Sequence, residues 1–344
     1  MRVLIKILTI TVFLGVGMAQ AAKLRVVTTL PDYADIAREI GGERVEVKSI
    51  VRGEQDAHYI RPKPSFVTLV RRADVLIDTG LDLEMWLPTV VDKSGNRRIR
   101  SGQPGYVSAA HGVRLLEKPK SISRIEGGVH IYGNPHITCS PLNMRRVAAN
   151  IASGLIRNDA AGKEYYSKRR DVYIHKLDEH LFGAELVKML GGDTLAALAE
   201  NGKLMDFLKR KKYEGKPLTD YLGGWMKQML PLRGKPIVTY HDAWIYFTRL
   251  FGLEEAGTVE PKPGIPPSPR HVLELTSMMR KRRIKILLAA NYFDEQKIRM
   301  VASRVGAEAV IVPVYVGGAT GADSYISLVD LWVNSLVRAA GNEK

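Results

Sequence analysis

Cysteine is almost absent from this chain, which has one, Cys139, among 344 residues. A single cysteine cannot form an internal disulfide, so the fold must be held together by packing of its core. Cys139 lies three residues after His136, which leaves two interpretations open. It could supply a thiolate ligand to a metal, or it is a small buried residue, and we prefer the second.

Several signatures of catalysis and nucleotide binding are also missing. The chain has neither a G-x-S-x-G elbow nor an H-E-x-x-H pair, which argues against α/β-hydrolase and helix-borne metalloprotease sites. The glycine-rich stretch 317–321 lacks the Lys-Ser/Thr of a phosphate-binding loop. After residue 21, no stretch approaches the ~20 apolar residues that a membrane span needs.

Acidic residues are outnumbered, 36 against 51 basic ones, for a net charge of +15. Such a surface can attract nucleic acid or anionic membranes. Solvated faces account better for the scattered basic runs, and without an aromatic-interleaved basic stripe we expect no nucleic-acid partner. The runs are Arg71-Arg72, Arg97-Arg98, Lys209 to Lys212 and Arg280 to Arg283.

The first 21 residues resemble a secretory signal peptide. Arg2 and Lys6 precede an apolar stretch, 7–18, and Ala19-Gln20-Ala21 is a cleavage pattern. An uncleaved anchor is the alternative, but the apolar stretch is short for a span. No cysteine follows it closely, so a lipid anchor is not expected. We therefore expect a soluble protein exported to the periplasm.

Strands and helices are expected to alternate in both halves of the mature chain. Apolar runs such as 24–29, 45–51 and 75–77 are separated by helical patterns, and the same rhythm returns between 236 and 313. This alternation predicts an α/β protein with two Rossmann-like lobes, each built on a parallel sheet. Ligands of such sheets bind beyond the carboxyl ends of the strands.

A long helical pattern from 160 to 190 predicts a rigid spine helix joining the lobes, with a break near Phe182-Gly183 as the alternative. The expected units are a signal peptide, an N-terminal lobe, a long linking helix, an interlobe helical insertion and a C-terminal lobe. Their ranges are 1–21, 22–157, 158–190, 191–230 and 231–344.

Three histidines stand far apart, each in its own polar or proline-containing segment. They are His58 in D-A-H-Y-I-R-P-K-P-S, His136 in H-I-Y-G-N-P-H-I, and His241 in V-T-Y-H-D-A-W. All three fall at expected strand ends or loops, where side chains can meet in one cleft. Three neutral imidazoles and one further ligand would suit tetrahedral Zn²⁺. Taken singly, each is more often a hydrogen-bonded structural residue.

His130 precedes His136 by six residues across a Gly-Asn-Pro turn, and it is either part of the site or a turn residue. Asp242 and Asp323 are candidates to orient ligands. The remaining histidines lack comparable surroundings and are expected to be structural. They are His111, His175, His180 and His271.

At these residues the chain resembles the periplasmic solute-binding proteins of zinc and manganese ABC transporters, the ZnuA/TroA-like family. The resemblance spans nearly the whole mature chain and is most specific at H-Y-x-x-x-x-P-S, G-N-P-H, T-Y-H-D-A-W-x-Y-F and V-E-P-K-P-G-I-P-P-S. It implies two α/β lobes joined by one long helix, with the metal held between them.

The resemblance implies that His58, His136 and His241 are metal ligands. A glutamate at the third position goes with manganese or iron in some members, so His241 favours Zn²⁺ over Mn²⁺, as imidazole chemistry does. The fourth ligand, often an Asp after the last strand, has no counterpart in Pro313-Val314-Tyr315-Val316. His130, Glu260, Asp323 or a water could take its place.

The expected function is therefore capture of Zn²⁺ outside the inner membrane, and its delivery to an ABC permease, by a monomeric binding protein that is not an enzyme. One alternative is a zinc-dependent enzyme with a three-histidine site, although no general base stands beside the histidines. Another is a surface adhesin that uses the same fold.

Overall fold

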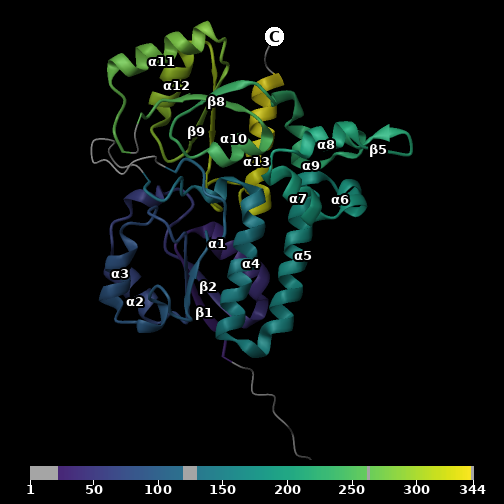
Figure 1. Cartoon of the computed structure of the whole chain (residues 1–344). Coiled ribbons are helices and arrows are strands. Elements are labelled where there is room, and N and C mark those ends of the chain that lie inside the picture. Colours follow the sequence, from purple (N-terminus) through teal and green to yellow (C-terminus); the bar gives the residue numbers. More distant parts are fainter. Residues whose placement is uncertain (1–21, 119–129, 262–263, 342–344) are drawn as a thin grey trace, which may run out of the picture.

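The computed structural model describes residues 22–118, 130–261 and 264–341. The expected signal peptide, 1–21, lies outside these residues. Within them, two four-stranded sheets stand one above the other (Figure 1). All neighbouring strands in both sheets are parallel. The expected α/β class with two parallel sheets is therefore confirmed.

The first sheet has the order β2-β1-β3-β4. Its strands are β1 (Leu24–Thr28), β2 (Val45–Ser49), β3 (Val75–Asp78) and β4 (Tyr106–Ser108). All four residues of β3 are buried, as in a central parallel strand covered on both faces. The three-residue edge strand β4 was not predicted, because a segment so short has no recognisable periodicity.

The second sheet has the order β10-β9-β7-β8. Its strands are β7 (Pro236–Thr239), β8 (Glu254–Thr258), β9 (Ile286–Ala290) and β10 (Glu308–Val312). In chain order, the two sheets have the same arrangement, since β8-β7-β9-β10 repeats β2-β1-β3-β4. The edge strand β8, Glu-Glu-Ala-Gly-Thr, was missed because it has neither an apolar run nor a clear alternation.

Helices cover the faces of both sheets (Figure 1). Those of the first lobe are α1 (Pro31–Gly41), α2 (Pro64–Arg71), α3 (Leu87–Ser94) and α4 (Pro141–Asn158). Those of the second lobe are α10 (Ile245–Phe251), α11 (Pro269–Lys281), α12 (Glu295–Ser303) and α13 (Tyr325–Gly341). Proline at the first helical turn of α1, α2, α4 and α11 fixes where these helices begin.

The linking segment is a helix of 20 residues, α5 (Lys163–Phe182), about 30 Å long, rather than one continuous helix over 158–190. It ends at Gly183, whose φ of 90° is a left-handed conformation that favours glycine. A Cβ at Gly183 would also lie 2.5 Å from the Cα of Gly223. The break near Phe182-Gly183 is thus the alternative that the structure adopts, and α6 (Ala184–Leu190) follows it.

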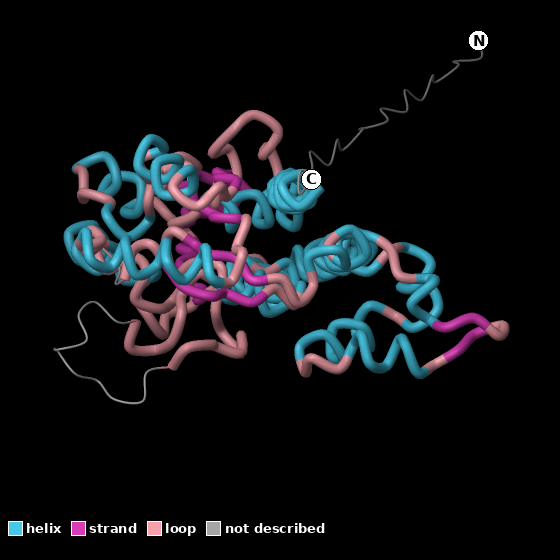
Figure 2. Tube along the Cα trace, turned by 90° about the horizontal axis from the view of Figure 1, so that it is seen from above, coloured by secondary structure: helices cyan, strands magenta, loops and turns pink. Residues whose placement is uncertain are grey.

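The segment after α6 forms small helices and a hairpin at one side of the lobes. Its elements are α7 (Gly192–Glu200), α8 (Leu204–Arg210), β5 (Lys212–Tyr213), β6 (Lys216–Pro217) and α9 (Gly224–Gln228). Seen from above, the β5–β6 hairpin projects away from both sheets (Figure 2). Trp225 anchors this region, because its indole N–H donates to Asp330 of α13 at 2.6 Å.

One hydrophobic cluster spans both lobes, from Val26 in the first sheet to Val312 in the second, and a second cluster lies within the second lobe. Within the first cluster the Tyr325 hydroxyl donates to the Thr138 carbonyl at 2.7 Å, and the Tyr325 amide donates to Asp35 at 2.8 Å. Among the helices described, none is long and apolar enough to cross a bilayer. The continuous core gives the loops between the sheets a rigid support.

Candidate metal centre

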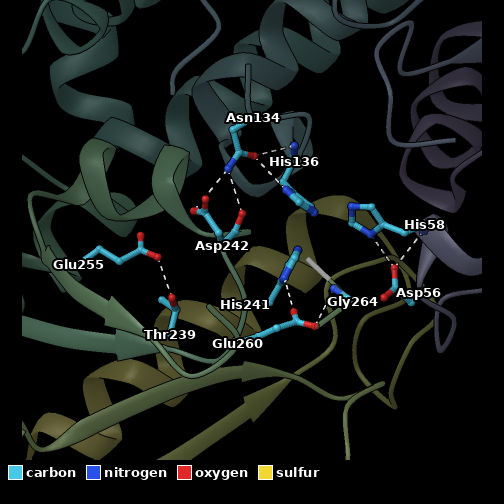
Figure 3. Close-up of polar contacts among 10 residues, drawn as sticks. All are labelled: Asp56, His58, Asn134, His136, Thr239, His241, Asp242, Glu255, Glu260 and Gly264. Carbon is cyan, nitrogen blue, oxygen red and sulfur yellow. Dashed lines mark hydrogen bonds and ion pairs between the residues drawn. The ribbon is translucent and has the colours of Figure 1, made fainter. Parts of the chain in front are cut away.

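Four histidines from three segments of the chain meet between the two sheets. His58 lies in a short 3₁₀ turn (Ala57–Tyr59) after β2, and His241 lies two residues beyond the end of β7. His130 and His136 belong to the segment between β4 and α4. Figure 3 shows the rings of His58, His136 and His241 directed toward one another. This is the carboxyl end of both sheets, where α/β proteins bind ligands.

His58, His136 and His241 form a compact triad. One ring nitrogen from each lies within 4.8 Å of the other two. The ring centroids are 5.1 Å apart for His58 and His136, 5.2 Å for His136 and His241, and 5.5 Å for His58 and His241. Among the described residues, this is the only group of three or more His, Cys, Asp or Glu side chains close enough to hold a metal.

His130 stands beside the triad without belonging to its tightest grouping. Its ring centroid lies 5.4 Å from that of His58 and 5.8 Å from that of His136. Its side chain is 14% exposed, slightly more than that of His58 at 10%. The structure therefore brings all four predicted histidines together, with His130 at the margin.

Two of the four rings are held by a residue two positions earlier in the chain. His58 Nδ1 lies 2.7 Å from Asp56 Oδ1, and the same oxygen accepts the backbone N–H of His58 at 3.0 Å. Asn134 Oδ1 repeats both contacts with His136, at 2.9 and 3.0 Å. Both are local turns in which a short Asp or Asn side chain bonds its own backbone.

The other two rings are held by residues remote in sequence. His241 Nδ1 lies 2.6 Å from Glu260 Oε2, beyond the end of β8, and the second oxygen of Glu260 accepts the Gly264 N–H at 2.8 Å. His130 Nδ1 lies 3.0 Å from Asp82 Oδ1, in the loop after β3. Glu260 was expected as a possible ligand, but here it orients His241.

These contacts determine which ring nitrogen carries the proton and which carries the free lone pair. A carboxylate can only accept a hydrogen bond, so neutral His58, His130 and His241 carry their proton on Nδ1. The Asn134 amide nitrogen donates to the Asp242 carbonyl and to Glu117, both at 2.9 Å, which fixes its oxygen toward His136. In all four rings Nε2 is buried and has no hydrogen-bond partner among the described residues. Each of the four rings therefore presents a buried lone pair on Nε2.

The electrostatics favour a neutral His136 ring and a charged Asp56. Burial lowers the pKa of His136 well below its usual value, and the neighbouring His58, His241 and His130 lower it further. For Asp56, burial favours the neutral acid, but its hydrogen bonds with His58 outweigh burial and lower its pKa. Histidine can ligate a metal only when neutral, so this environment prepares His136 for that role.

Asp242 contacts Asn134, the residue that holds the His136 ring. Burial, followed by repulsion from Glu117 and Glu255, raises the pKa of Asp242 to about 7. Its backbone carbonyl and its Oδ1, the latter at 3.5 Å, both face the Asn134 amide. Asp242 thus supports His136 through Asn134, which agrees with its predicted role in orienting a ligand.

The other candidates lie elsewhere. Cys139 is fully buried in the core, where burial raises the pKa of its thiol, and it is not part of the metal-binding group. Asp323 is exposed. His271 Nε2 lies 2.9 Å from the Thr258 carbonyl, and His180 stacks on Trp225. Sequence reasoning missed the roles of Asp56 and Asp82; only Asp56, two residues before His58, carried a local signal.

Comparison with known proteins agrees with this geometry. The family model "Zinc-uptake complex component A periplasmic" matches residues 26–181 and 217–339. Among curated relatives, the iron-binding protein YfeA of Yersinia pestis is 24% identical over 93% of this chain and 88% of its own length. The manganese-transporter lipoprotein PsaA of Streptococcus pneumoniae is 25% identical over 81% and 76% of the two chains. The zinc-uptake protein ZnuA of Bacillus subtilis is 21% identical over 87% and 80%.

Solved structures show the same fold. A crystal structure of ZnuA superposes with a TM-score of 0.68 at 18% identity, covering 92% of this chain and 99% of that one. A manganese-bound periplasmic metal-binding protein from candidatus Liberibacter asiaticus gives 0.65 at 16% identity, with coverage of 92% and 100%. The chain belongs to the family of the periplasmic zinc-uptake component A, the extracytoplasmic metal-binding proteins of ABC transporters, which bind their ion and are not enzymes.

Proposed function

We propose that this protein captures Zn²⁺ in the periplasm and delivers it to an ABC permease. The observation that carries the proposal is the grouping of His58, His136 and His241 within 4.8 Å of one another, each with a buried Nε2 that has no hydrogen-bond partner among the described residues. The segment 1–21 would direct export, and the mature chain would act as a monomer. Relatives are named for iron, manganese and zinc, so the preference for zinc rests on this chain's own donors.

The donor set supports zinc by its chemistry. Imidazole nitrogen suits Zn²⁺, whereas Mn²⁺ prefers carboxylate and other oxygen ligands. The nearby carboxylates of Asp56, Asp82 and Glu260 each have an oxygen engaged at an imidazole Nδ1. These carboxylates would not bind the ion directly. Through their hydrogen bonds to the imidazoles they would offset its positive charge and make the imidazoles stronger ligands.

We propose His58, His136, His241 and His130 as the four ligands. Tetrahedral Zn²⁺ with bonds of about 2.0–2.1 Å places ligand nitrogens roughly 3.3 Å apart. The triad, within 4.8 Å, needs only small side-chain movements to reach that spacing. His130 must move further, so it would close on the ion after the other three and replace its last water.

Titration calorimetry with Zn²⁺ tests this proposal on the exported chain. We expect one ion per protein, and no measurable binding by the His58→Ala/His136→Ala variant. His175→Ala is the matched control, because His175 lies on the exposed face of α5 and contacts Glu179. Unchanged binding by the double variant would refute the site. An anomalous signal at the zinc edge in metal-bound crystals would establish both the ion and the fourth ligand.

A further inference from the structure

Residues 182–216 lie between the two ranges that match the family model and are not part of the match. The structure describes all of them. Leu195, Leu208 and Leu218, which follows this segment, are all buried, with at most 5% of each residue exposed. This packing holds α8 and the β5–β6 hairpin together, and α7 contacts both α8 and α5.

The hairpin has a sharply defined shape. Lys212 pairs with Pro217 and Tyr213 with Lys216, so the loop between the strands is Glu214-Gly215. Both loop residues have positive φ, 49° and 80°, as in the tight turns that suit twisted hairpins. The Tyr221 hydroxyl donates to the Tyr213 carbonyl at 3.3 Å and braces the hairpin from behind.

Basic side chains crowd this hairpin and the end of α8. Between residues 203 and 216 there are six basic residues and two acidic ones, for a net charge of +4. The six are all exposed, and none forms an ion pair with any residue that the structure describes. They are Lys203, Lys209, Arg210, Lys211, Lys212 and Lys216. Tyr213 stands among them with 49% of its surface exposed.

We propose that this basic hairpin, residues 209–216, docks the protein onto an anionic phospholipid surface. Each lysine near such a surface contributes to attraction through the surface potential. An aromatic ring with a polar hydroxyl, such as Tyr213, prefers the level of the lipid headgroups. The hairpin's position away from both sheets lets it touch a flat surface without hindrance from the lobes (Figure 2).

The residue types favour lipid over a shaped acidic protein site. Five of the six basic residues are lysines, whose ammonium groups are mobile point charges that suit a diffuse negative surface. A structured carboxylate site is usually matched by the planar fork of arginine, and Arg210 is the only arginine here. This inference stands independently of which metal the histidines bind.

Vesicle co-sedimentation of the exported chain tests the proposal. Vesicles of neutral phosphatidylcholine are compared with vesicles that also contain phosphatidylglycerol, at low and high salt. We expect binding only to the anionic vesicles, weakened by salt. Lys211→Gln/Lys212→Gln should lower the partition coefficient about tenfold or more, and Tyr213→Ser should lower it a few-fold while leaving the net charge unchanged.

The second lobe offers a matched control. Lys281→Gln/Lys285→Gln removes the same charge from exposed positions around the basic end of α11, on the opposite side of the molecule from β5 (Figure 1). Control binding close to that of the unmodified chain, with loss in the hairpin variant, supports the proposal. Equal losses in both variants would mean that net charge alone acts, and would overturn it. Failure to bind anionic vesicles, or hairpin-dependent binding only to a permease in neutral lipid, would overturn it too.

Discussion

The two lobes have the same strand order but contribute unequally to the metal centre. The first lobe and the segment after β4 supply His58, His130 and His136, whereas the second lobe supplies only His241. Strand β7 corresponds in position to β1. His241 is the second residue after β7, whereas the second residue after β1 is Leu30, which cannot bind a metal. A shared topology therefore fixes where ligands can stand, and loop sequence decides which residues stand there.

The two lobes also differ in how they hold their rings. After β2, Asp56 and His58 share one short turn, so ligand and support come from the same loop. In the second lobe the corresponding loop, after β8, provides only the support, Glu260, and the ring comes from the loop after the neighbouring strand β7. The site in the second lobe thus depends on correct pairing of β7 and β8, whereas His58 and Asp56 need only their own turn.

The largest effect should come from His241→Ala, which removes the only ring of the second lobe. We expect the zinc affinity to fall by more than ~100-fold, beyond the 10–100-fold typical of losing an outer partner. His130→Ala should cost less, because His130 stands at the margin of the cluster. Competition with a zinc chelator measures both variants.

His271→Ala is the control for that comparison. It removes another histidine of the second lobe, whose ring contacts the Thr258 carbonyl and lies outside the cluster. It should bind zinc as the unmodified chain does. If His130→Ala proved as damaging as His241→Ala, His130 would be a full ligand, and its place at the margin of the cluster would be wrong.

The sequence predicted features that depend on neighbouring residues better than features that depend on contacts between distant segments. Apolar runs and proline positions predicted the central strands and most long helices, because these depend on local periodicity. All four candidate histidines stood out by their local motifs, and Asp56 and Asn134 lie within those motifs. Asp82 and the true role of Glu260 could not be predicted, since both depend on which loops the sheets bring side by side.

An intermediate effect is expected when the supports are changed. Glu260→Gln should weaken zinc binding about 10–100-fold, because the carboxylate that fixes and polarises His241 is lost. Asp56→Asn should cost less, since Asn134 already fills the same place before His136 with an amide oxygen. Calorimetry on both variants compares remote with local support. A greater loss for Asp56→Asn than for Glu260→Gln would contradict the comparison.

The smallest effect concerns folding stability, and it contrasts Asp56 with a buried pair, Asp78 at the end of β3 and Glu84 in the loop that follows. For Asp78, burial and then repulsion from Glu84 raise the pKa well above its usual value. A raised native pKa gives stability that is complete below the unfolded value of about 3.9 and is lost as pH rises through the native pKa. For Asp56, whose pKa is lowered, stability is present above that value and is lost as pH falls through the native pKa.

Two variants can therefore separate these carboxylates in the metal-free protein. Asp78→Asn removes a charge that the core does not compensate, so it should raise the free energy of unfolding by about 1–3 kcal/mol at pH 8, and by less at pH 5. Asp56→Asn should lower the free energy of unfolding at neutral pH, by a margin that shrinks toward pH 3. Urea denaturation with a chelator present, at pH 3, 5 and 8, measures both trends. A stabilisation by Asp78→Asn that did not grow with pH would contradict this account. It would show that Asp78 and Glu84 do not repel each other as charged groups in the native protein.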